Sequence, residues 1–288
     1  MNTMSLSLRR FSAGMLAACA LCAGMAVAAP LEPVFGLAQQ AQPTYLETLK
    51  RLVSIESGSR DREGLDAIAQ VIGEQFKALG GQVEYIEPPE EVNRGVPAAE
   101  RIGRMVQARF TGAGSKKILL IGHMDTVYPR GMLAKSPFRI EGERAYGLGI
   151  NDDKQGVALI IHTMALLKQI NFKDYAQVTV LINADEEIGS RGSRHLITQL
   201  GAEHDATFSL EPSLASSDKL SLATAGIGSV TLNVTGKASH AGGSPEKGLN
   251  ALYEMAHQIL QMRDLSDPSI GLKMNWTVAK AGEVRNVI

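Results

Sequence analysis

Hydrophobic positions alternate between helical and strand spacings along most of the chain from Tyr45 onward. Over 62–79 apolar side chains recur every three or four residues and two glycines follow, which predicts an amphipathic helix with a glycine stop. A second helix is expected over 155–168. Short apolar runs rich in β-branched residues predict buried strands at 105–110, 117–122, 178–183 and 207–210. This alternation is typical of an α/β fold, a sheet with helices on its faces.

The pattern restarts after this part and predicts a smaller second unit. A strand is expected over 228–235, then a helix capped by Ser244, then another strand over 273–280. Such a run is half of a small α+β unit, so the unit is expected to be incomplete at Ile288. The proline-rich stretch 87–101 is expected to be a surface loop.

The N-terminus differs in kind from the rest. Arg9 and Arg10 precede an uncharged apolar run over 11–27, followed by small residues and Pro30, which indicates a cleaved signal peptide over 1–28. A membrane anchor is the alternative, but the run is shorter than the about 20 residues that span a bilayer. A lipoprotein cleavage box ending at Cys19 and a poor twin-arginine match stay open. Neither of these two variants changes the compartment, so we expect a periplasmic or secreted protein.

Composition narrows the classes of function. The 288 residues are 44% hydrophobic and 20% charged with a formal net charge of -1, so the chain has no broad basic field for nucleic acid. The mature charge, after loss of two arginines and no acids, is about -3 and suits a protein without stable membrane association. Both cysteines, Cys19 and Cys22, lie in the expected signal. A mature chain without thiols excludes a cysteine nucleophile, thiolate ligands and disulfides.

Polar groups follow the predicted strands directly. Ligands of open α/β sheets bind at the carboxyl ends of strands, so we expect these groups to share one crevice. They are His123 and Asp125, then Asp185, Glu186 and Glu187, then Glu211, with Asp152 and Asp153 opening the second helix. Singly, each has an ordinary structural explanation, such as a hydrogen-bonded histidine, acids at a helix N-terminus or a solvated turn. Together, several acids in one crevice repel one another, and a metal cation resolves that repulsion.

One imidazole with several carboxylates suits zinc, with manganese or cobalt as alternatives. Two metals that share a carboxylate need about twice the ligands of one tetrahedral site, and the visible set is one ligand short of that.

Five blocks, in this order along 45–288, resemble the co-catalytic zinc exopeptidase family, which includes aminoacylase, succinyl-diaminopimelate desuccinylase and glutamate carboxypeptidases. The similarity is greatest to its carboxypeptidase G (glucarpidase) branch. The blocks are 122–127, 149–154, 185–190, 210–212 and 236–242. The resemblance implies a zinc exopeptidase-like catalytic domain over 31–223, with an inserted ferredoxin-like lid and dimerisation domain, here incomplete, over 224–288.

By the same resemblance, two zinc ions are held by four residues of this chain. His123 and Glu211 bind separate metals or the same pair, Asp152 bridges the metals, and Glu187 is a further ligand. The family's last metal-binding histidine lies beyond Ile288, so the 288-residue chain by itself is expected to bind one metal weakly and to turn over little or no substrate.

The remaining roles also come from the resemblance. Glu186 is the general base and Asp125 orients the ligand His123. His240 resembles a lid histidine that stabilises the developing oxyanion, although a Ser-His-Ala-Gly turn can also be only a turn. Asn286 stands where the family has an asparagine near the substrate carboxylate.

The leading hypothesis is therefore an exported homodimeric metallopeptidase that hydrolyses the amide bond to a C-terminal amino acid, with glutamate favoured. Its substrate is a small peptide or an N-acyl amino acid. One alternative is an aminoacylase or dipeptidase acting on another amino acid. Another is a truncated, non-catalytic homologue that binds a metal or ligand. A serine hydrolase is disfavoured because the Gly-x-Ser-x-Gly motif is absent.

Overall fold

The computed structural model describes residues 33–212, 220–224 and 226–288. The chain divides into two compact units, Met1–Pro212 and Ser213–Ile288. The expected signal peptide at 1–28, with both cysteines, lies outside the described residues. Within the described part, every helix is too short or too polar to cross a bilayer.

The first unit is built on a mixed sheet flanked by helices, as the sequence predicts, and the sheet has five strands. Its strands β2, β6, β3 and β7 correspond to the four apolar runs, whereas β1 was not predicted. In spatial order the strands are β1 (Gln82–Ile86), β2 (Met105–Thr111), β6 (Gln177–Asn183), β3 (Lys117–His123) and β7 (Ala206–Ser209). The first three are antiparallel neighbours, and β6, β3 and β7 run parallel. The carboxyl ends of these three strands therefore meet at one edge, with His123 opposite Asn183.

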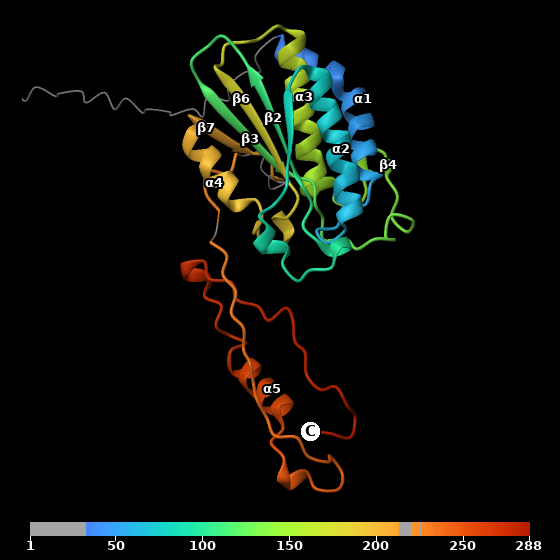
Figure 1. Ribbon diagram of the computed structural model, residues 1–288, viewed down its shortest axis with the longest axis vertical. Coiled ribbons are helices and arrows are strands. Elements are labelled where there is room, and N and C mark those ends of the chain that lie inside the picture. Colours follow the sequence, from blue (N-terminus) through green and yellow to red (C-terminus); the bar gives the residue numbers. More distant parts are fainter. Residues whose placement is uncertain (1–32, 213–219, 225) are drawn as a thin grey trace, which may run out of the picture. The chain divides into compact units, whose positions relative to one another are not determined.

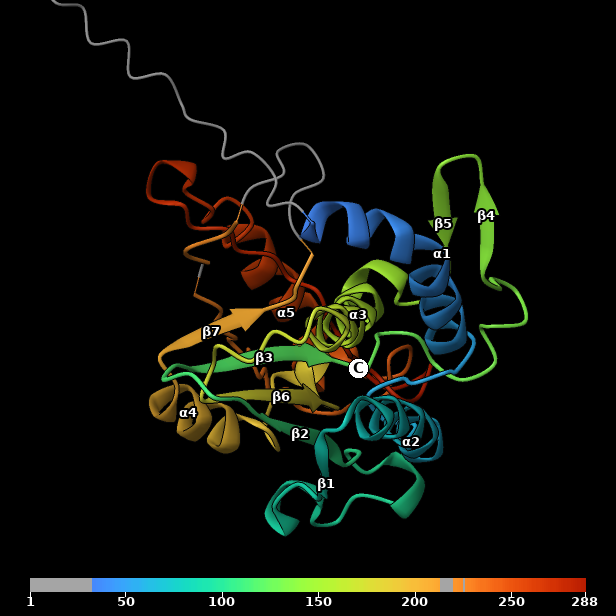
Figure 2. The same cartoon turned by 90° about the horizontal axis from the view of Figure 1, so that it is seen from above.

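Helices cover both faces of the sheet (Figures 1 and 2). One face packs on α2 (Arg62–Leu79) and α3 (Gln155–Gln169), with α1 (Val34–Val53) against α3, and α4 (Arg194–Glu203) packs on the other. Alternate side chains of β6 point to opposite faces of the sheet. Val180 and Ile182 pack in the larger core, whereas Leu181 packs with Leu200 of α4 on the other face. This alternation gives both faces of a central strand an apolar contact.

Helix α2 has the bounds expected from its apolar spacing. Its stripe, which includes Leu65, Ile68 and Phe76, is buried in the main core. The helix begins after Asp61, whose side chain accepts a hydrogen bond from the Gly64 backbone N–H at 3.1 Å. It ends at Gly80, which has φ 98°, a left-handed conformation that glycine adopts without steric cost.

We expect Asp61→Ala to lower the free energy of unfolding by about 1 kcal/mol because the first turn of α2 loses its cap. Urea denaturation measures this change. Glu63→Ala is the matched control, since Glu63 and Asp61 both pair with Arg130 but only Asp61 caps the helix. The control is expected to stay within about 0.5 kcal/mol of the parent protein. Equal losses in the two variants would show that the ion pairs, and not the cap, stabilise this end.

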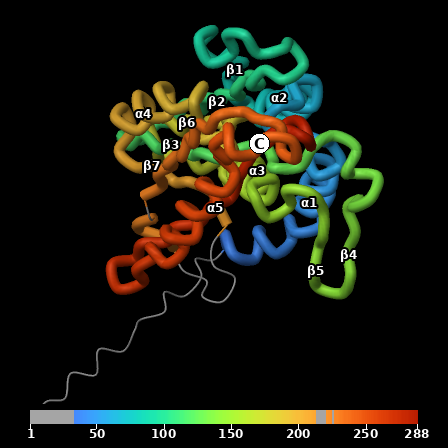
Figure 3. The backbone as a smooth tube through the Cα atoms, turned by 90° about the horizontal axis from the view of Figure 1, so that it is seen from below, coloured from blue at the N-terminus to red at the C-terminus, as the bar shows by residue number. Residues whose placement is uncertain are grey.

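Two segments of the first unit, a loop and a hairpin, lie outside the sheet. The stretch 87–101 is a surface loop as expected, with short 3₁₀ turns η1 (Glu90–Asn93) and η2 (Ala98–Glu100). A hairpin of β4 (Arg139–Glu141) and β5 (Arg144–Tyr146) projects beside α1 in Figures 2 and 3. The apolar pattern of the sequence does not predict this hairpin, α1 or α4.

The second unit differs from the expected pattern. Neither 228–235 nor 273–280 forms a strand, because the described residues there pair with no neighbouring backbone, and Val230 and Val278 are each 76% exposed. Three isolated bridges, such as Lys237 with Leu249, are the described β pairings of this unit. The prediction of the two strands was therefore wrong for this structure, since an apolar pattern makes a ladder only where a partner strand lies beside it.

The helix of this unit also starts later than expected. Ser244 makes no capping hydrogen bond and precedes only a 3₁₀ turn, η5 (Pro245–Lys247). Helix α5 (Ala251–Gln261) is capped instead by Asn250, whose side-chain oxygen accepts from the Leu252 and Tyr253 N–H groups. A further turn, η6 (Pro268–Ile270), follows it.

Candidate metal centre

The acids and the histidine singled out in the sequence lie at the carboxyl edge of the parallel strands. His123 is the last residue of β3, and Glu211 follows β7. Glu186 and Glu187 begin the 3₁₀ turn η4 (Glu186–Ile188), which follows β6. Asp152 lies in η3 (Ile150–Lys154), just before α3. Distant parts of the chain meet here because strand ends and a helix start share one edge of the sheet.

His123 is the centre of the cluster and is fully buried. Its Nδ1 donates to the backbone oxygen of Asp125 at 3.1 Å and lies 3.3 Å from the Asp125 side chain. Its Nε2 faces two further acids, with Asp152 Oδ1 at 2.9 Å and Glu211 Oε1 at 3.7 Å. Since Nδ1 is held by Asp125, Nε2 is the nitrogen available to a metal.

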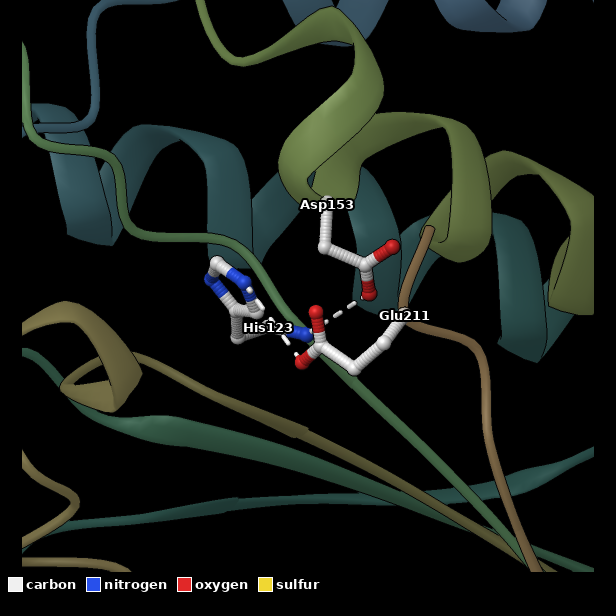
Figure 4. A group of neighbouring side chains, drawn as sticks. All are labelled: His123, Asp153 and Glu211. Atoms are coloured by element: carbon white, nitrogen blue, oxygen red, sulfur yellow. Dashed lines mark hydrogen bonds and ion pairs between the residues drawn. The ribbon is translucent and has the colours of Figure 1, made fainter. Parts of the chain in front are cut away.

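Asp153 also belongs to this cluster, although its place in the sequence suggests no role beyond opening the helix. Ligand atoms of His123, Asp153 and Glu211 lie within 4.8 Å of one another (Figure 4). Asp153 is fully buried, and its Oδ2 accepts from the His123 backbone N–H at 3.3 Å. Asp152 is the more exposed acid, and its carboxylate faces the free imidazole nitrogen.

Glu186 and Glu187 are placed by the backbone of their turn. Asp125 Oδ1 accepts from the Glu186 N–H at 3.1 Å, and Asp125 Oδ2 accepts from the Glu187 N–H at 3.2 Å. The carboxylate of Glu187 is not part of the 4.8 Å group described above. Burial and the charge of Asp152 nevertheless raise the pKa of Glu187 to about 7, so the two carboxylates interact. Burial also raises the pKa of Glu186.

The electrostatics of the cluster fit a bound cation. Burial raises the pKa of Asp153 to about 8, and burial also raises the pKa of Glu211. Burial alone lowers the pKa of His123, but its hydrogen bond to Asp125 and the surrounding acids raise it to about 10. The adjacent cation Lys154 does not relieve this charge, since its Nζ donates to the Ile55 backbone oxygen at 2.7 Å. Asp153 Oδ1 is buried and has no hydrogen-bond partner among the described residues.

A donor set of one imidazole and several carboxylates suits Zn²⁺, and Mn²⁺ or Co²⁺ also accept such ligands. The residues present therefore fit the metal that the sequence predicts.

A pocket of about 720 Å³ opens beside these loops. Its wall includes Glu187 and Ile188 from η4, Thr126 and Val127 from the loop after β3, and residues 58–61. The volume is that of a small-molecule site.

The second unit carries the two other candidate residues. His240 Nδ1 accepts from the Gly242 and Gly243 N–H groups at 3.2 and 2.9 Å, which leaves its proton on Nε2. The Ala241 N–H donates to the Asn286 backbone oxygen at 2.9 Å, so His240 and Asn286 lie on adjoining segments. His240 is thus an exposed hydrogen-bond donor within this unit.

Comparison with known proteins supports the resemblance. The family model described as peptidase family M20/M25/M40 matches residues 119–278. The chain is 44% identical over 283 residues to carboxypeptidase G2 of Pseudomonas sp. (strain RS-16), which covers 98% of this chain and 66% of the relative. It is 29% identical to acetylornithine deacetylase of Proteus mirabilis (strain HI4320), over 78% of this chain and 56% of that protein.

Among solved structures, a tripeptidase from Staphylococcus aureus subsp. aureus Mu50 has a similar fold. The TM-score is 0.56 at 19% identity, over 85% of this chain and 63% of that chain. This chain therefore spans about two thirds or less of the length of these relatives.

Proposed function

Because this chain belongs to peptidase family M20/M25/M40, we propose that the full-length protein is a metallo-exopeptidase that hydrolyses the amide bond to a C-terminal amino acid. The observation that carries the proposal is the contact of His123 Nε2 with the carboxylates of Asp152 and Glu211. Asp153 is buried beside the imidazole while Asp152 and Glu211 face its Nε2, and this donor set suits a hydrolytic metal site.

The proposed ligands are His123, Asp152, Glu187 and Glu211, with Asp152 shared between two zinc ions. Bound zinc would polarise the scissile carbonyl and acidify a water molecule in the site. Asp125 holds the ligand histidine through Nδ1 and so directs Nε2 into the cluster.

Glu186 is the proposed general base. Its backbone is fixed by Asp125, and its exposed side chain can reach a water molecule. In the reaction Glu186 takes a proton from that water as the C–O bond forms. It then passes the proton to the leaving nitrogen as the C–N bond breaks, so the carboxylate is regenerated.

We propose glutamate as the C-terminal amino acid released, with a peptide or another acyl group on its nitrogen. The support is the identity to a carboxypeptidase over nearly the whole of this chain. The 720 Å³ pocket next to Glu187 has room for the acyl group. His240, as a donor through Nε2, is the proposed oxyanion residue, and Asn286 is proposed to contact the substrate carboxylate.

A substrate panel tests this choice of amino acid. Amides with one common acyl group on glutamate, leucine and ornithine are the matched set, with kcat/KM as the measurement. We expect glutamate to exceed the others by about 100-fold, since a site built to bind a charged side chain leaves its polar groups unpaired with the others. A preference for the ornithine amide would instead favour an acylornithine hydrolase, the second candidate suggested by the weaker match.

Export and a homodimer complete the proposal. Export rests on the apolar N-terminal run after Arg9 and Arg10. The homodimer through 224–288 rests on the family resemblance.

A further inference from the structure

The connection between α1 and α2 lies directly against the loops of the candidate metal centre. Within it, the Ser57 backbone oxygen accepts from the Thr126 N–H at 2.9 Å, and the Ser59 N–H donates to the Thr126 oxygen at 3.2 Å. The Ile55 oxygen accepts from Lys154 Nζ in the loop before α3. Residues 55–59 thus support two loops that carry proposed metal ligands.

One side chain of this 55–59 segment reaches the site itself. Ser59 Oγ donates to Asp125 Oδ2 at 2.7 Å, which is the shortest contact that Asp125 makes. Asp125 is fully buried, and Ser59 is 6% exposed. The bond is therefore shielded from water.

The Asp125 carboxylate joins groups from three separate segments. Oδ2 accepts from Ser59 Oγ and the Glu187 N–H, whereas Oδ1 accepts from the Glu186 N–H and faces His123 Nδ1. The carboxylate thus accepts three hydrogen bonds, and the fourth of its roughly four lone-pair positions lies toward His123 Nδ1. Rotation of this one carboxylate would disturb the imidazole, the proposed base and a proposed ligand together.

We propose that Ser59 is a positioning residue for the hydrolysis, because its hydroxyl holds the Asp125 carboxylate in the orientation that places His123 and the Glu186–Glu187 turn. This inference rests on the proposed function. Without the hydroxyl, Oδ2 keeps, among the residues that the structure describes, only the 3.2 Å contact with the Glu187 N–H. The carboxylate is then free to turn, and both zinc binding and proton transfer lose their fixed geometry.

Ser59→Ala tests the proposal, with Ser57→Ala as the matched control. Ser57 is 1% exposed and its Oγ has no hydrogen-bond partner among the described residues, so both variants remove one buried hydroxyl from the same segment. We expect Ser59→Ala to weaken zinc affinity of the metal-free protein about 10-fold and to lower kcat about 10-fold with KM unchanged. Ser57→Ala is expected to leave all three values unchanged. Zinc affinity is measured by competition with a chelating dye.

A double-mutant cycle with Asp125→Ala shows whether Ser59 acts through Asp125. We expect Ser59→Ala to cost no further zinc affinity once the carboxylate is gone. The proposal is overturned if Ser59→Ala matches Ser57→Ala, or if its effect persists in the Asp125→Ala background. A failure of the proposed function gives a different result. In that case zinc binding still depends on Ser59, but the full-length protein hydrolyses no substrate.

Discussion

Glu186→Gln is expected to lower kcat of the full-length protein about 10³-fold, because an amide of the same shape cannot take a proton from water. The Glu186 N–H should keep its bond to Asp125, since the backbone and not the side chain makes it. Zinc affinity and the stability of the fold are therefore expected to be unchanged. Steady-state kinetics on an N-acyl-glutamate, beside a zinc titration, measure both quantities.

Two further variants show whether the loss of activity is specific to Glu186. Glu187→Gln replaces the neighbouring proposed ligand, so it should weaken zinc binding, which Glu186→Gln should not. Glu203→Gln alters an exposed glutamate of α4 and should change neither quantity. Retention of full activity by Glu186→Gln would exclude Glu186 as the base.

Removal of the metal is the second large effect that we expect. Prolonged dialysis against a chelator should reduce hydrolysis to background, and added zinc should restore it. The reason is that Asp153, Glu187 and Glu211 have raised pKa values, so these carboxylates need a compensating cation to stay charged together. Zinc at about 100 times its Kd should also stabilise the fold by about 2.7 kcal/mol, seen as a higher melting temperature.

His123→Ala is the control for specific binding, because this variant should lose most of the zinc-dependent rise in melting temperature. Activity that survives metal removal would contradict the proposed reaction. Tight zinc binding without hydrolysis by the full-length protein would instead support the non-catalytic alternative.

The spacing of apolar residues was sufficient to predict an element where one face of it is buried in the core and the other faces water. The apolar stripe of 62–79 predicted the bounds of α2, and the four short apolar runs predicted β2, β3, β6 and β7. The same reasoning failed at 228–235 and 273–280, where no partner backbone lies beside the chain among the described residues. A strand depends on pairing outside its own segment, whereas a helix closes its hydrogen bonds locally.

The start of the helix in the second unit was mispredicted because two nearby residues can each cap a helix. Ser244 and Asn250 are both residues that cap helices well, and the sequence does not say which one does so. In the structure Asn250 accepts from two backbone N–H groups, whereas Ser244 makes no such bond. The helix therefore begins seven residues after the expected cap, at position 251.

By itself, the sequence determined the residue types of the candidate site and the strand ends that carry them. It did so because acids and a histidine directly after buried strands must collect at one edge of a parallel sheet. Only the tertiary structure decided that Asp152 faces the His123 imidazole while Asp153 bonds its backbone, since adjacent acids look alike in a sequence. Only the fold, likewise, brings Ser59 to Asp125, 66 positions away along the chain, because such a contact follows from packing and has no local pattern.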